Sequence, residues 1–164
     1  AQTGHLVLAT LHCNDTVDAV QRLADLDMHA NSIASELTAV IAQRLARRIC
    51  TSCRKPAKPR AELLAEVFPD GPPPAFVCYE GEGCDRCGGS GTRGRVAVVE
   101  LLQITPDLRR AISRGAVVDD LRLLAHQSGL RSLRESALEL VVRGTIAMTE
   151  LYDVLSAEQM RPLV

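Results

Sequence analysis

The chain has 164 residues, no tryptophan, and only two phenylalanines and two tyrosines. Since 46% of the residues are hydrophobic, its core must be built from aliphatic side chains, and a disordered or collagen-like chain is excluded. No apolar run approaches the roughly 18 residues that a membrane-spanning helix needs. The first residues also lack the basic start and apolar stretch of an export signal, so we expect a cytoplasmic protein.

The net charge of −1 conceals an uneven distribution of charged residues along the chain. Residues 1–42 contain one arginine and five acidic residues, whereas residues 43–60 contain seven basic residues and no acidic one. The rest of the chain has 11 basic and 15 acidic residues. The chain therefore lacks the overall positive field that is typical of nucleic-acid-binding proteins.

Two apolar runs are typical of strands. Residues 6–11 read Leu-Val-Leu-Ala-Thr-Leu, which suits a parallel strand buried on both faces, and residues 95–102 form the second candidate. Because a doubly buried strand needs neighbours that this sequence does not supply, we expect the chain to be a fragment of a larger protein.

Helical spacing appears on either side of a proline-rich stretch. Asn14 or Asp15 is expected to cap a helix over residues 16–26. A second, long helix is expected from Asn31 or Ser32 to Ile49, where apolar residues recur with helical periodicity. The prolines of residues 55–83 predict an irregular insertion with one short helix at 61–68 and one extended piece at 76–79. Four short helices are then expected, over residues 106–113, 119–127, 132–143 and 149–156, with glycines 115, 129 and 144 as C-terminal caps.

Four cysteines form two C-x2-C pairs, namely Cys50 with Cys53 and Cys84 with Cys87. A pair with this spacing makes a tight turn that directs both thiolates at one tetrahedral ion, and four thiolates suit zinc. The gap of 30 residues exceeds the usual spacing of a zinc ribbon, and the proline-rich insertion explains the excess. We therefore predict a closed, structural zinc site that folds the insertion. Cys13 and Cys78 are expected to be ordinary small residues.

The histidines at the start of the chain are weaker candidates. His5 and His12 flank the apolar run, and an odd separation directs them to opposite faces of a straight strand. Ligands bind beyond the C-terminal ends of parallel strands, which favours His12 over His5 as a site residue. From spacing alone, a hydrogen-bonded structural role is favoured for both.

A resemblance to a known family rests on several motifs in order. Residues 3–15, TGHLVLATLHCND, resemble the histidine box of the secretion ATPases, and residues 41–50, IAQRLARRIC, follow in the order seen in that family. The second cysteine pair, residues 91–95 and 99–102, and the glycine-containing motifs at 129–133 and 144–151 continue the likeness. The chain resembles the C-terminal part of a type II secretion or type IV pilus assembly ATPase over about residues 1–156.

This resemblance implies a fold and a function. The fold would be an α/β fragment of a RecA-like domain, with a buried parallel strand, a four-cysteine zinc insertion and a mainly helical C-terminal part. The implied domains are residues 1–49, 50–94 and 95–164. The parent would be a hexamer that uses ATP and Mg²⁺ and acts on an inner-membrane platform protein and cytoplasmic secretion or pilus components. His12, and His5 beside it, would lie near the terminal phosphate, and the protein would be peripheral to the inner membrane through its partners.

One absence limits what this chain does alone. The sequence contains no G-x-x-x-x-G-K-[ST] loop, which cradles phosphates with backbone N–H groups and a lysine. We therefore predict that the chain by itself does not hydrolyse ATP.

Three alternatives remain at this point. The paired cysteines and the basic run up to Arg60 also suit a zinc ribbon that binds nucleic acid, although stacking aromatics are scarce. Residues 84–91 match a chaperone-type zinc knuckle, which that family repeats four times and this chain has once. The insertion and the C-terminal helices could also serve only as an interaction module, with Arg47 and Arg48 in contacts between subunits.

Overall fold

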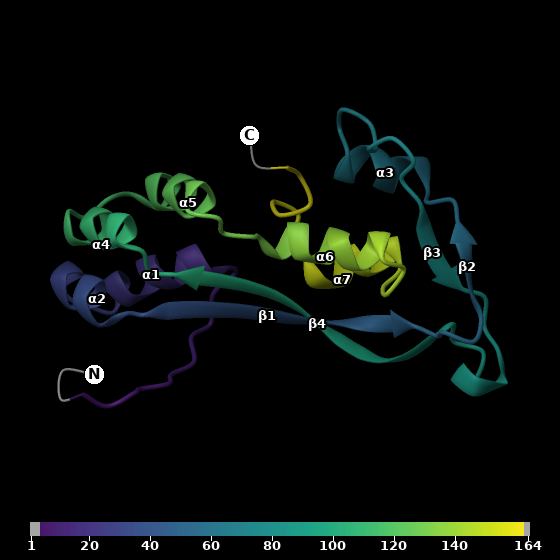
Figure 1. Ribbon diagram of the computed structural model, residues 1–164, viewed down its shortest axis with the longest axis horizontal. Helices are drawn as coiled ribbons and strands as arrows, with labels where there is room; N and C mark the ends of the chain where they lie inside the picture. The colour runs from purple at the N-terminus through teal and green to yellow at the C-terminus, as the bar shows by residue number, and fades with distance from the viewer. Residues whose placement is uncertain (1–3, 163–164) are drawn as a thin grey trace. The chain divides into compact units, whose positions relative to one another are not determined.

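The computed structural model describes residues 4–162, which form a mixed α/β fold with two two-stranded sheets (Figure 1). The chain divides into two compact units. The first comprises the residues up to Ala42 together with Glu100–Ser132, and the second comprises Gln43–Val99 and the residues from Leu133 on. The domain boundaries expected from the sequence stay predictions. No helix among the described residues is both long enough and apolar enough to span a membrane.

The first unit contains four helices around an aliphatic core. The helices are α1 (Thr16–Asp25), α2 (Ala30–Glu36), α4 (Pro106–Ser113) and α5 (Val118–Gln127). Helix α2 packs against α4, and α5 packs against both α1 and α4. Their buried side chains include Val17, Ile33, Leu108 and Leu121. The predictions for α1, α4 and α5 are confirmed to within a residue at each end.

The long helix predicted up to Ile49 is wrong. Helix α2 ends at Glu36, and strand β1 (Ala39–Ile49) follows. The helical spacing would bury Ile41 and Leu45 together, yet both are exposed, at 66% and 55%, while Ala46 is buried. This alternation has the period of a strand. The long-range partner of β1 overrides the local pattern, since β1 pairs with β4 (Thr92–Gln103).

Strands β1 and β4 run in opposite directions (Figure 1). Just beyond one end of the ladder, the N–H of Ile104 donates to the carbonyl of Thr38 at 3.0 Å. At the other end, the N–H of Cys50 donates to the carbonyl of Gly91 at 2.9 Å. The predicted strand at residues 95–102 is thereby confirmed, as part of an antiparallel pair.

The buried strand predicted at residues 6–11 is not formed. This segment is irregular, and the side chains of Leu6 and Leu8 are 85% and 87% exposed. A strand needs a neighbour to accept and donate its backbone hydrogen bonds, and no strand among residues 4–162 pairs with it. Both sheets pair other segments, so the expected buried parallel strand is absent from the described part of the chain.

The second unit joins a small sheet to helices that lie far apart in the sequence. Strands β2 (Arg54–Ala57) and β3 (Cys78–Gly81) pair antiparallel, with α3 (Ala61–Val67) between them in the chain. The helix α6 (Leu133–Val142), the 3-10 helix η2 (Met148–Glu150) and α7 (Leu151–Val154) complete the unit. The sequence predicted α3, α6 and the last helical segment, but it missed β2.

Candidate metal centre

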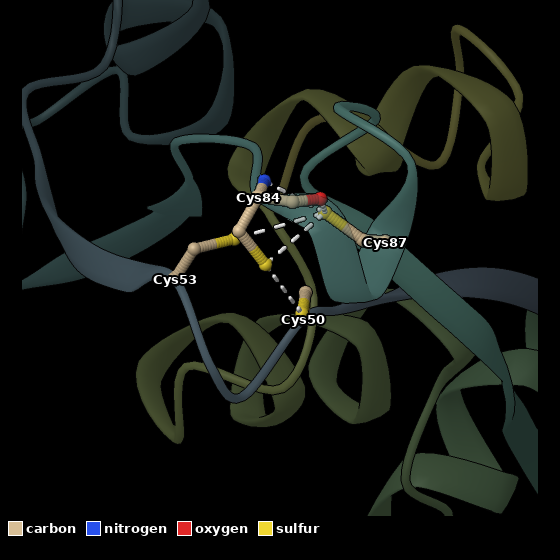
Figure 2. A group of neighbouring side chains, drawn as sticks. All are labelled: Cys50, Cys53, Cys84 and Cys87. Atoms are coloured by element: carbon tan, nitrogen blue, oxygen red, sulfur yellow. Dashed lines mark hydrogen bonds between the residues drawn. The ribbon is translucent and has the colours of Figure 1, made fainter.

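Two turns bring the four paired cysteines together in the second unit (Figure 2). Cys50 and Cys53 lie in the turn between β1 and β2, where the N–H of Cys53 donates to the carbonyl of Cys50 at 3.3 Å. Cys84 and Cys87 lie at the 3-10 helix η1 (Asp85–Cys87), where the N–H of Cys87 donates to the carbonyl of Cys84 at 3.1 Å. Each C-x2-C pair therefore forms the tight turn that its spacing predicts.

The sulfur positions match those of a tetrahedral metal site. The four Sγ atoms all lie within 4.8 Å of one another. The Sγ atoms of Cys50 and Cys84, and those of Cys53 and Cys87, are 3.9 Å apart, and those of Cys84 and Cys87 are 3.7 Å apart. Four sulfurs at about 2.3 Å from one zinc ion would be separated by about 3.8 Å. These three separations fit a tetrahedral site, so the cluster could hold one metal ion.

Backbone contacts between the two turns fix their spacing. The N–H of Glu82 donates to the carbonyl of Cys53 at 3.0 Å, alongside the Cys50–Gly91 bond at the end of the ladder. The backbones at Gly81 and Gly91 pass so closely that a Cβ on either residue would overlap the other's carbonyl. Glycine is required at both positions, because only a residue without a side chain allows this approach.

The electrostatics of the cluster suit a site that loses protons when metal binds. The N–H of Cys84 donates to Sγ of Cys87 at 3.2 Å, and this hydrogen bond lowers the pKa of the Cys87 thiol to about 6. Desolvation raises the pKa of Cys53 to about 11. A metal ion stabilises the thiolate form of every ligand, so binding would release the protons that the cluster retains at neutral pH.

The structure does not bring the other candidate residues into this cluster. Among residues 4–162, the four cysteines are the one group of His, Cys, Asp or Glu side chains placed to hold a metal ion. His5 and His12 lie in the exposed segment before α1, in the first unit. Cys13 is half-buried, and buried Cys78 donates from Sγ to the carbonyl of Ala57 at 3.3 Å, as suits a structural residue.

A second polar cluster lies at the end of the histidine-containing segment, and of its members the sequence predicted only the cap at Asp15. Buried Glu100 accepts hydrogen bonds from the N–H and Oγ1 of Thr16, at 2.9 and 2.5 Å. Asp15 caps α1 and pairs with Arg122 at 2.9 Å. The sequence contained one signal for Glu100. This charged residue lies between Val98 and Leu102 on the face of an apolar strand that is buried.

The fold and the cysteine cluster define a mixed α/β protein with four cysteines placed so that they could hold one metal ion. The family model for "Type II/IV secretion system protein" matches residues 1–153. The chain therefore belongs to the type II/IV secretion system protein family.

Curated relatives of two kinds match most of this chain. It is 37% identical over 151 residues to the type IV pilus assembly ATPase PilB of Thermus thermophilus, covering 92% of this chain and 17% of that protein. It is 38% identical over 152 residues to the type II secretion system protein HxcR of Pseudomonas aeruginosa, covering 93% of this chain and 29% of that protein. The chain thus spans less than a third of the length of either relative.

Proposed function

We propose that this chain is the C-terminal portion of an ATPase that powers type II protein secretion or type IV pilus assembly. The observation that carries the proposal is the match of residues 1–153 to the family, with relatives named as pilus assembly ATPases and secretion proteins. Relatives of both kinds match at nearly the same identity, so the proposal covers either machinery. The nucleic-acid-binding alternative is not favoured, because neither the family nor these relatives carry such a name.

In this proposal, Cys50, Cys53, Cys84 and Cys87 hold one structural zinc ion. The sulfur spacing of 3.7–3.9 Å supports this assignment, as do the four thiol ligands that zinc prefers. Four protein ligands leave no open coordination position, so zinc would supply folding free energy and not chemistry. Other groups of the chain support this site. Gly81 and Gly91 allow the two cysteine turns to approach each other, and the N–H of Cys84 favours the thiolate form of Cys87.

The remaining parts of the proposal concern the whole protein. The parent would be a homohexamer with a RecA-like core that binds ATP and Mg²⁺, with His12 and His5 near the terminal phosphate. It would lie in the cytoplasm against the inner membrane, held there by the platform protein and by cytoplasmic components of the machinery. The chain alone would not hydrolyse ATP, since its sequence has no phosphate-binding loop with a lysine.

A chimaera tests this function. The segment of the Pseudomonas aeruginosa PilB that matches this chain is replaced by the chain. We expect the chimaera to turn over ATP, while the truncated PilB and the isolated chain show no more turnover than a heat-denatured control. Turnover by the isolated chain would contradict its predicted inactivity. A chimaera that assembles as PilB does but has no turnover would contradict the proposed function.

A further inference from the structure

The turn after α6 receives side chains from the sheet that carries the cysteines. The guanidinium of Arg54, the first residue of β2, lies 4.9 Å from the ring centroid of Tyr79 in β3. Its Nη1 donates to the carbonyl of Gly144 at 3.4 Å and to that of Arg143 at 3.5 Å. Strand β3 also contacts both α6 and η2. The small sheet is therefore docked on the end of α6.

This docking leaves no room for a side chain at Gly144. The residue has φ +65, and a Cβ there would lie 2.6 Å from Cδ2 of Tyr79 and 3.2 Å from Nη1 of Arg54. A separation below 3.0 Å forces one partner to move, and the nearest atom belongs to a rigid ring. The Tyr79 ring thus packs directly on the backbone of the turn.

The residues on either side of the first cysteine pair both donate hydrogen bonds to the turn at residues 143–145. Ile49, which precedes Cys50, donates its N–H to the carbonyl of Thr145 at 2.9 Å. Arg54, which follows Cys53, donates to the carbonyls of Arg143 and Gly144. We call these hydrogen bonds of Ile49 and Arg54 the two anchors. The distance between them is set by the turn from Cys50 to Cys53. Closure of that turn around a metal ion therefore fixes both anchors at once.

The turn leads directly into the helices at the end of the second unit. Ile146 and Met148 are buried, and Glu150 in η2 accepts from the backbone N–H and the Nε of Arg47, both at 2.8 Å. Arg47 lies in β1, three residues before Cys50. If the turn at Cys50–Cys53 loosened, the turn after α6 would therefore be released, and the hydrogen bonds between Arg47 and Glu150 that hold η2 would weaken.

We propose that the contacts of Ile49, Arg54 and Tyr79 with the turn at residues 143–145 couple metal occupancy of the four-cysteine cluster to the docking of η2 and α7. The coupling rests on the proposed zinc site. It makes the second unit a metal-dependent conformational device: with metal bound, the C-terminal helices are held, and without it they are released. Because coupling between two events is reciprocal, loss of the docking contacts must also weaken metal binding.

Hydrogen exchange with and without EDTA tests this coupling in the full 164-residue chain. In the wild-type protein, EDTA is expected to speed exchange not only at the two cysteine turns but also at residues 143–150. The double variant R54A/Y79L lacks the docking side chains. We expect fast exchange at residues 143–150 in this variant even with zinc bound. The matched control is K55A, which removes a cation of the same strand β2 that pairs with Glu80 and Glu82 and not with residues 143–145.

The reciprocal effect gives a second readout that does not depend on local exchange. Zinc affinity is measured by competition with a chromophoric chelator. We expect R54A/Y79L to bind zinc about 5- to 150-fold more weakly than the wild type, which is the change in affinity that typical coupling free energies produce. K55A is expected to bind zinc as the wild type does. Equal zinc affinity in all three proteins would overturn the coupling.

Elemental analysis separates the two ways in which the proposal can fail. If the wild-type chain binds zinc but EDTA leaves exchange at residues 143–150 unchanged, the coupling is refuted and the zinc site stands. If the folded wild-type chain binds no zinc, the zinc site and the coupling are refuted together, while the proposed ATPase function is still decided by the chimaera.

Discussion

Substitution of Gly144 by alanine perturbs the second unit in two separable ways. The backbone at this position has φ +65, in the left-handed region that residues with a side chain rarely adopt. The new Cβ would also lie 2.6 Å from Cδ2 and 3.0 Å from Cγ of Tyr79. Gly115 offers a matched control, since it follows α4 with φ +71 and a Cβ there would meet nothing within 4 Å.

The costs of the two effects add. Placing alanine in the left-handed region costs about 1–2 kcal/mol. Forcing a methyl group into a filled space costs about 1–3 kcal/mol more. We therefore expect G144A to lower the free energy of unfolding by about 2–5 kcal/mol, and G115A to lower it by only about 1–2 kcal/mol.

Urea denaturation followed by far-UV circular dichroism measures both variants. Tyrosine fluorescence adds a probe of the second unit, because both tyrosines lie there and the chain has no tryptophan. In a double-mutant cycle, Y79A is expected to relieve the overlap, so that G144A costs less in the Y79A background. If G144A costs no more than G115A, or if Y79A relieves nothing, the contact described at Gly144 is refuted.

Two further predictions concern the first unit and the cysteines outside the cluster. T16V removes a hydroxyl that donates to buried Glu100 and is expected to cost about 1–3 kcal/mol in urea denaturation, whereas an unchanged stability would show that this hydrogen bond is dispensable. In the native chain at pH 7, alkylation mapped by mass spectrometry should modify half-buried Cys13 before buried Cys78. Burial raises the pKa of both thiols, so both reactions should accelerate as the pH rises toward 9, and equal rates for the two would contradict the burial of Cys78.

Features with a local cause were predicted from the sequence. Asp15 caps α1 through hydrogen bonds to the N–H groups of Val17 and Asp18, and Thr105 with Pro106 begins α4. Glycines 115, 129 and 144 have positive φ where helices end. The two C-x2-C pairs fall into the same category, because each turn is set by four consecutive residues. Their meeting in space was expected because one zinc ion takes four ligands.

Features that depend on distant partners were not predicted. The segment up to Ile49 has helical spacing, and its strand conformation follows from pairing with β4, about 50 residues further along the chain. The hydrogen bond between Thr16 and Glu100 joins residues 84 apart. The contact of Tyr79 with Gly144 joins strand β3 to the turn after α6, which no local pattern connects. The apolar run at residues 6–11 shows the same dependence in reverse: a strand pattern without a paired neighbour stays irregular.

Zinc content is the most direct test of the central claim, that the four cysteines organise the second unit around one ion. Elemental analysis of the purified chain is compared with that of a variant in which Cys50, Cys53, Cys84 and Cys87 are all serine, with C78S as the control. We expect one zinc ion per chain in the wild type and in C78S, and none in the fourfold variant. A folded wild-type chain without zinc, or a fourfold variant that keeps it, would contradict the account.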